Sequence, residues 1–145
     1  MPPILDLDPL ALVGTWDLSR VIVDHQDGQQ SRVLGTTTLT LQDDVRIRWA
    51  ESGTLSHRGI EAAVSRVLYV EKRAGGWFVT FEDGRDFHPW EPGVPVEHGC
   101  APDLYIGTVD RVDERRWSVE WRVTGPSKDY TMASVLTRAE GKAKA

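Results

Sequence analysis

The stretch Gly14-Thr15-Trp16 opens the part of the chain that decides the fold. From Trp16 onward, apolar and polar residues alternate with the period of two that is typical of a strand with one buried face. On that face lie Trp16, Leu18, Arg20 and Ile22. Near the other end of the chain, Arg138 occupies the inward register of the last predicted strand. If the first and last strands pair to close a barrel, the Arg138 guanidinium packs across the Trp16 ring in a cation–π contact and seals one end.

Working outward from this stretch, the sequence predicts short strands separated by turn signals and almost no helix. Asp8-Pro9 is typical of one short N-terminal helical turn, with Asp8 as its cap and Pro9 at its first position. Turn signals such as Asp27-Gly28 and Asp83-Gly84 indicate hairpins. The predicted strands cover residues 15–25, 31–41, 45–51, 62–71, 77–81, 85–88, 103–109, 117–123 and 128–138. The fold class is therefore all-β, a single antiparallel up-and-down barrel.

Length and composition limit the possibilities further. At 145 residues the chain is expected to form one domain. We divide it into an arm and short turn at residues 1–13, a barrel at 14–138 and a disordered tail at 139–145. The net charge of −5 and the pI of about 5.3 argue against nucleic acid or an anionic membrane as partner. Residues 1–6 do not resemble a signal peptide, and the single cysteine, Cys100, permits no intrachain disulfide, so we expect a cytoplasmic protein.

The segment 89–102 differs from the rest because it contains four prolines and two glycines. We predict an irregular connection that covers the mouth of the barrel as a lid, at the end opposite Trp16 and Arg138. A ligand-sized cavity is then expected to open beneath it.

Several polar residues fall on the predicted inward face, namely Arg20, Glu51, Tyr130 and Ser134. Buried charges are costly unless they are paired, so the favoured interpretation of Arg20 and Glu51 is a structural ion pair. The alternative is a polar pocket that fixes the head group of a small ligand. Trp117 and Trp121 lie four residues apart on one strand and are expected to fill the interior.

His88, His98 and Cys100 invite two chemical interpretations. Zinc accepts these residue types, but their spacing matches no strong zinc pattern, so we expect no metal and no cofactor. A nucleophilic Cys100 is disfavoured against a half-buried thiol under the loop.

Three further segments carry a resemblance to a known family: Phe81-Glu82-Asp83-Gly84-Arg85-Asp86-Phe87-His88, His98-Gly99-Cys100-Ala101-Pro102-Asp103-Leu104-Tyr105, and residues 121–130. Together with Gly14-Thr15-Trp16 they resemble a bacterial family catalogued as domain of unknown function 6314. The resemblance covers most of the chain and implies a lipocalin-like, calycin-type barrel. It brings no substrate and no catalytic residues. Ser127, Leu68 and Leu136 depart from the pattern we expect, and the smaller side chains at the last two positions would reshape a cavity.

Three functions remain open at this point. The first is a small-molecule-binding barrel that holds a hydrophobic or aromatic ligand, with a set of candidate contacts: Arg20, Trp49, Glu51, Arg85, Tyr105, Trp121, Tyr130 and Met132. The second is an enzyme of the cyclase or isomerase type, with His88 and His98 as acid–base groups. The third is a protein-interaction module whose barrel is filled. Whether the chain is an enzyme, and how it oligomerises, the sequence leaves undecided.

Overall fold

The structure is a computed structural model that describes residues 7–140. The part of the predicted arm at residues 1–6, including the stretch compared with a signal peptide, lies outside the described residues, and so does the part of the predicted tail at 141–145. The predicted helical turn is a 3-10 turn, η1 (Pro9–Leu12), and the backbone N–H of Leu10 donates to the carboxylate of its cap, Asp8. Among residues 7–140 no helix is long and apolar enough to cross a membrane.

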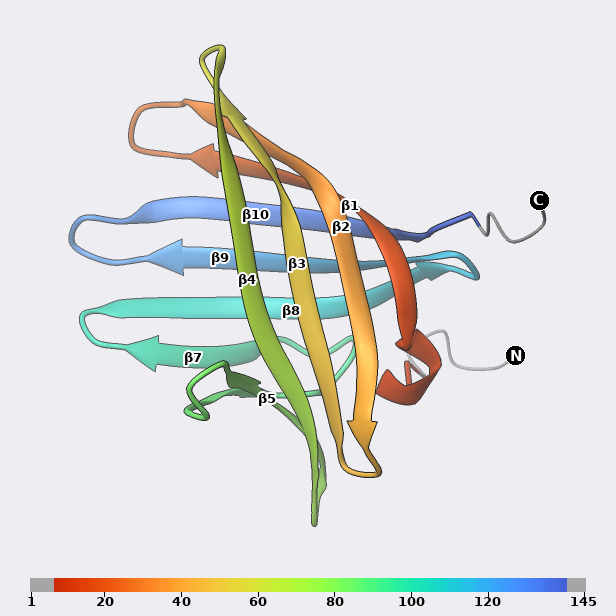
Figure 1. The fold of residues 1–145 in the computed structure, drawn as a ribbon. Coiled ribbons are helices and arrows are strands. Elements are labelled where there is room, and N and C mark those ends of the chain that lie inside the picture. The colour runs from red at the N-terminus through yellow and green to blue at the C-terminus, as the bar shows by residue number, and fades with distance from the viewer. Residues whose placement is uncertain (1–6, 141–145) are drawn as a thin grey trace.

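Ten antiparallel strands form one sheet that curls into a nearly closed barrel (Figure 1). The predicted all-β antiparallel barrel is confirmed, with one strand more than the nine predicted. They are β1 (Gly14–Asp24), β2 (Gln30–Asp43), β3 (Arg46–His57), β4 (Ile60–Arg73), β5 (Gly76–Phe81), β6 (Asp86–Pro89), β7 (Val96–Cys100), β8 (Asp103–Asp113), β9 (Arg116–Thr124) and β10 (Asp129–Arg138). The order in the sheet is β6-β5-β4-β3-β2-β1-β10-β9-β8-β7. Strands that are neighbours in the sequence therefore pair with each other, except for the edge strands β6 and β7, and β1 also pairs with β10, which joins the two halves of the chain.

The two halves cross at a steep angle. In Figure 1, β1 to β4 run across the front and β7 to β10 lie behind them, with the β7–β8 and β9–β10 hairpins on the left and η1 on the right. Trp16 is paired with Arg138 at the right-hand end, which we call the floor, whereas Asp24 is paired with Tyr130 at the opposite end, which we call the mouth.

The floor is packed with indole rings. Arg138 lies 4.1 Å from the centre of the Trp16 ring, so the predicted contact is confirmed. The Gly-x-Trp signature has a steric reason here: Gly14 has φ +137°, and a Cβ on it would lie 2.7 Å from Nη1 of Arg138. Trp117 packs edge-to-face against Trp16 and Trp49, with ring centres 5.9 and 5.6 Å apart. The floor is thus a solid aromatic layer.

Our prediction that the segment 89–102 forms an irregular lid over the mouth is wrong. Residues 96–100 form strand β7, which returns the chain from the floor to the mouth. The irregular part before it lies at the floor: Trp90 packs against Trp49 and Trp117 and donates its indole N–H to the Leu7 carbonyl at 2.9 Å. The segment does cover one end of the barrel, but packing of the apolar Trp90 ring places it over the floor and not over the mouth.

The wall of the barrel is incomplete in two places. β6 and β7, the two edge strands, share no ladder within the described chain, and His98 on β7 bonds the Phe87 carbonyl on β6 across this seam, 3.1 Å from Nδ1 to the oxygen. In addition, β5 pairs only with Leu68–Arg73 of β4, so residues 60–67 of β4 have one edge free of backbone pairing to a further strand. A hollow of about 620 Å³ lies at the end of this shortened pairing, between Arg66 and Arg85.

Candidate functional site

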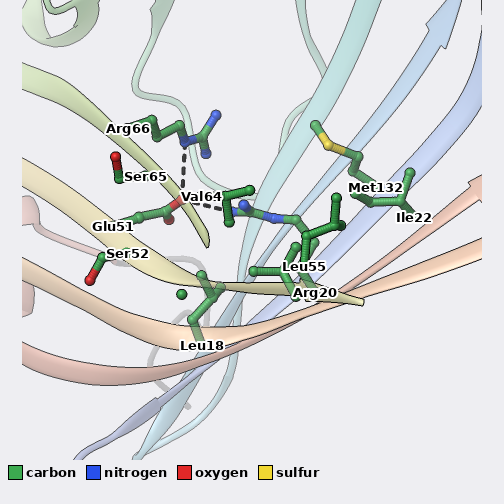
Figure 2. Close-up of a pocket in the computed structure, with 12 residues that line it drawn as sticks. Leu18, Arg20, Ile22, Glu51, Ser52, Leu55, Val64, Ser65, Arg66 and Met132 are labelled. Atoms are coloured by element: carbon green, nitrogen blue, oxygen red, sulfur yellow. Dashed lines mark hydrogen bonds and ion pairs between the residues drawn. The ribbon is translucent and has the colours of Figure 1, made fainter. Parts of the chain in front are cut away.

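The centre of the barrel holds a cluster of three charged side chains, Arg20, Glu51 and Arg66 (Figure 2). Arg20 Nη2 and Arg66 Nε donate to the same oxygen of Glu51, at 2.9 and 3.0 Å. The strand register explains the meeting, because Glu51 on β3 is paired with Arg66 on β4. The predicted Arg20–Glu51 pair is therefore present, but it is part of a triad.

Neutral donors complete the surroundings of this carboxylate. Its second oxygen accepts the Trp49 indole N–H at 3.1 Å and the Thr37 hydroxyl at 3.3 Å. Arg20 is fixed in turn by Ser134, whose hydroxyl oxygen lies 2.7 Å from Nε. Such a network satisfies a buried charge that would otherwise be very costly.

The electrostatics follow from this arrangement. Burial by itself raises the pKa of Glu51, but the charges of Arg66 and Arg20, together with the hydrogen bonds it accepts, hold that pKa below its usual value of 4.5. Glu51 is ionised at neutral pH, and the triad carries one net positive charge.

A cavity of about 290 Å³, which we call the first lobe, adjoins the triad. Besides the three charged residues, its walls are mostly aliphatic and include Leu18, Ile22, Val33, Leu55, Val64 and Met132. Figure 2 shows the Arg20 stem running among these apolar groups. The interior is therefore not packed solid, contrary to the filled barrel expected of a pure interaction module.

A second cavity, the second lobe, of about 310 Å³, has a different lining. Its walls are largely aromatic, with Phe87 stacked on Trp121 at 5.0 Å and on Phe81 at 4.5 Å between ring centres. Gly107 makes room for Trp121, because a Cβ there would lie 2.5 Å from the indole ring. Arg66 and Met132 line both lobes and mark their boundary.

Most of the predicted ligand-contacting residues line one lobe or the other. Arg20 and Glu51 line the first lobe, and Met132 lines both. The second lobe contains four more: Arg85, Tyr105, Trp121 and Tyr130. Trp49 lines neither, because its ring packs into the floor.

The two predicted acid–base residues differ in their surroundings. His98 lines the second lobe, with Nδ1 bonded to the Phe87 carbonyl. His88 is only 3% exposed, lines neither lobe and donates Nδ1–H to the Pro89 carbonyl at 2.8 Å. Burial lowers the pKa of His88 to about 4, which leaves its ring neutral at pH 7.

Cys100 is exposed rather than half-buried, because β7 ends there at the mouth, although it also borders the second lobe. Over residues 7–140, no group of three or more His, Cys, Asp or Glu side chains is arranged to hold a metal ion.

Two residues of the site escaped the sequence analysis. Arg66 shares a face with Leu68 and Val70, both buried, so strand alternation on β4 contained the signal that places it inward. Thr37 lies in a run of three threonines that the sequence characterises only as β-branched, and its contact with Glu51 depends on the β2–β3 register.

Comparison with known proteins is consistent with this architecture. Residues 12–138 match the model of a family of unknown function, DUF6314. The chain belongs to this family. No curated protein matches the sequence.

Among solved structures, the barrel is similar to the S-type phycobiliprotein lyase CPES from Guillardia theta, with a TM-score of 0.60 and 13% identity over 92% of each chain. It is also similar to a de novo designed fluorescence-activating β-barrel, with a TM-score of 0.50 and 17% identity, covering 92% of this chain and 99% of the design. At these identities the likeness shows the β-barrel fold and nothing more.

Proposed function

We propose that this member of the DUF6314 family is a cytosolic barrel that binds a small hydrophobic or aromatic molecule. The observation that carries the proposal is the pair of lobes, one mostly aliphatic and one largely aromatic, that share the side chain of Arg66 at their boundary. Small-molecule sites are concave and mostly apolar, with few polar groups that orient the ligand. Each lobe is near the lower end of the volume range for such sites, so the ligand is a small molecule and not a protein segment.

The route into the site supports the same proposal. The first lobe borders the part of β4 that β5 leaves unpaired, and the hollow beside Arg66 and Arg85 lies there. A ligand can reach both lobes from this side without disturbing the aromatic floor. The solved barrels named in the comparison include a fluorescence-activating design and a phycobiliprotein lyase, which agrees with a barrel that accommodates small molecules.

The proposal is tested by blocking the cavity at its boundary. Met132→Trp places an indole between the two lobes, and Val135→Trp places the same side chain on the same strand at a site that is 37% exposed. The neutral fluorescent probe N-phenyl-1-naphthylamine reports occupancy of an apolar cavity. We expect saturable binding to the wild type and to Val135→Trp, and loss of binding in Met132→Trp. Equal binding by all three proteins, or no binding by the wild type, contradicts the proposal.

An enzyme is the second candidate, and His98 is the observation in its favour. Its Nδ1 donates to the Phe87 carbonyl, which leaves Nε2 without a partner among the described residues, and the side chain lines the second lobe. The measurement is mass spectrometry of any molecule that copurifies with the protein, before and after prolonged incubation. Conversion by the wild type and none by His98→Gln supports the enzyme, whereas an unchanged ligand supports a binding protein.

A further inference from the structure

The Arg66 guanidinium has hydrogen-bonding capacity that the protein does not use. Its Nε is bonded to Glu51, but neither Nη atom forms a hydrogen bond with any of the described residues. Figure 2 shows this end of the side chain directed away from Glu51. The side chain is 34% exposed, at the boundary between the two lobes. A guanidinium offers its two Nη groups as a planar fork that matches an oxyanion.

The charge of the cavity walls points in the same direction. The linings of the two lobes contain three arginines, Arg20, Arg66 and Arg85, and one carboxylate, Glu51. The chain as a whole has a net charge of −5, so this positive interior runs against the overall composition.

The three arginines are not equivalent as anion sites. Arg20 is held by Ser134 and Glu51. Arg85 is paired with Asp83 at 2.8 Å, and its side chain is 73% exposed, so water competes there with any ligand. Arg66 lines both lobes and is fixed through Nε alone, which leaves its Nη edge for a ligand.

We propose that the ligand is an organic anion, an apolar body with one oxyanion group that binds the Nη atoms of Arg66. This inference rests on the proposed function, because it adds a charge to the small hydrophobic molecule placed in the lobes. One negative charge neutralises the triad, in which two guanidiniums face one carboxylate. The apolar part of the ligand then occupies a lobe lined by aliphatic or aromatic side chains.

The role of Glu51 in this site is to position Arg66. The bond to Nε holds the guanidinium at the boundary of the lobes with its Nη edge outward. Fixing a long side chain in advance lowers the entropy lost when the anion binds. The carboxylate does not neutralise the site, since Arg20 shares the same oxygen.

A matched pair of probes separates the charge from the apolar body. N-phenyl-1-naphthylamine and 8-anilinonaphthalene-1-sulfonate share one ring system, and the second carries a sulfonate. We expect the wild type to bind the sulfonate roughly tenfold more tightly than the neutral probe. Arg66→Gln should remove this preference, so that the two probes bind this variant equally well, and a cooperative thermal unfolding transition shows that the variant is folded. Arg85→Gln is the matched control and should keep the preference, because Arg85 is already paired at the rim.

The outcomes separate this inference from the proposed function. If the neutral probe binds but the sulfonate binds no more tightly, or if Arg66→Gln keeps the preference, the anion site is overturned and the apolar cavity stands. If Arg85→Gln removes the preference as fully as Arg66→Gln does, the assignment to Arg66 is overturned. If neither probe binds, the proposed function fails and the anion site fails with it.

Discussion

Arg138 at the floor and Arg66 at the boundary of the lobes are both inward-facing arginines on long strands, but their surroundings differ. Arg138 covers the Trp16 ring and donates to the carbonyls of Val13 and Ala11 at 3.3 and 3.1 Å. Both its positive charge and its N–H donors therefore have partners within the chain. Arg66 is bonded to the rest of the described chain through Nε alone, and its side chain lines both lobes.

The two arginines thus mark two parts of one barrel, a floor that is packed and a mouth half that contains cavities. At the floor, aromatic rings fill the space and the polar end of Arg138 closes the barrel. Toward the mouth, the same fold leaves two lobes and a guanidinium with unused donors. The partners of Arg138 all belong to the protein, which is what a stabilising contact requires, whereas the donors that Arg66 leaves unused are available to the anion that we propose.

The largest expected effect is at the triad, where Glu51→Gln leaves two guanidiniums facing each other with no carboxylate between them. Removing one member of a buried ion pair costs about 3–5 kcal/mol, and the Glu51 side chain is only 4% exposed. Urea unfolding should show this loss, while Glu120→Gln on the exposed face of β9 should have little effect. A loss below about 1 kcal/mol would mean that the triad does not hold this half of the barrel together.

The next effect concerns pH and His88, which packs against Trp121 behind the second lobe. Its folded pKa of about 4 lies below the ordinary 6.5, so the unfolded chain binds the proton first. Burial of the neutral ring therefore does not reduce the free energy of unfolding above pH 6.5. As the pH falls from 6.5 toward 4, protonation of the unfolded chain lowers the free energy of unfolding by about 3 kcal/mol in total. Unfolding free energies measured between pH 7 and pH 4 should fall steeply in the wild type and less in His88→Asn. Equal slopes in the two proteins would contradict a neutral buried ring.

The smallest of these effects is at the floor. Arg138→Ala removes the contact with Trp16 and should cost roughly 1–3 kcal/mol of unfolding free energy. It should leave the binding of both naphthylamine probes unchanged, because Arg138 lines neither lobe. A loss of probe binding in a protein that remains folded would abolish the separation between floor and mouth.

The floor was predictable because its signals are local. Alternation places Trp16 and Arg138 on the inward face of the first and last strands, and closure of the barrel then brings them together. The same alternation predicted the Arg20–Glu51 pair. The contribution of Trp90 was missed because its partner Leu7 is 83 residues away and no periodicity connects them. Five residues of strand among prolines were likewise too short a signal to reveal β7.

The candidate site was predictable in part. Every predicted ligand contact except Trp49 lines a lobe, and the inward register of residues such as Arg20 and Tyr130 follows from strand alternation. What the sequence lacks is the relative placement of strands: Arg66 reaches Glu51 through the β3–β4 register, and the cavity exists because β5 covers only part of β4. The Arg66–Glu51 contact and the cavity both depend on the register and the length of the strand pairings, which the residue types do not specify.

The most direct test of the account is an NMR titration of the arginine side-chain ¹⁵N–¹H resonances with 8-anilinonaphthalene-1-sulfonate. It compares the two arginines in one sample. We predict that the Arg66 resonances shift and saturate as the probe is added, while those of Arg138 stay in place. Unchanged Arg66 resonances under saturating probe, or equal shifts at both residues, would contradict a binding site in the mouth half of the barrel.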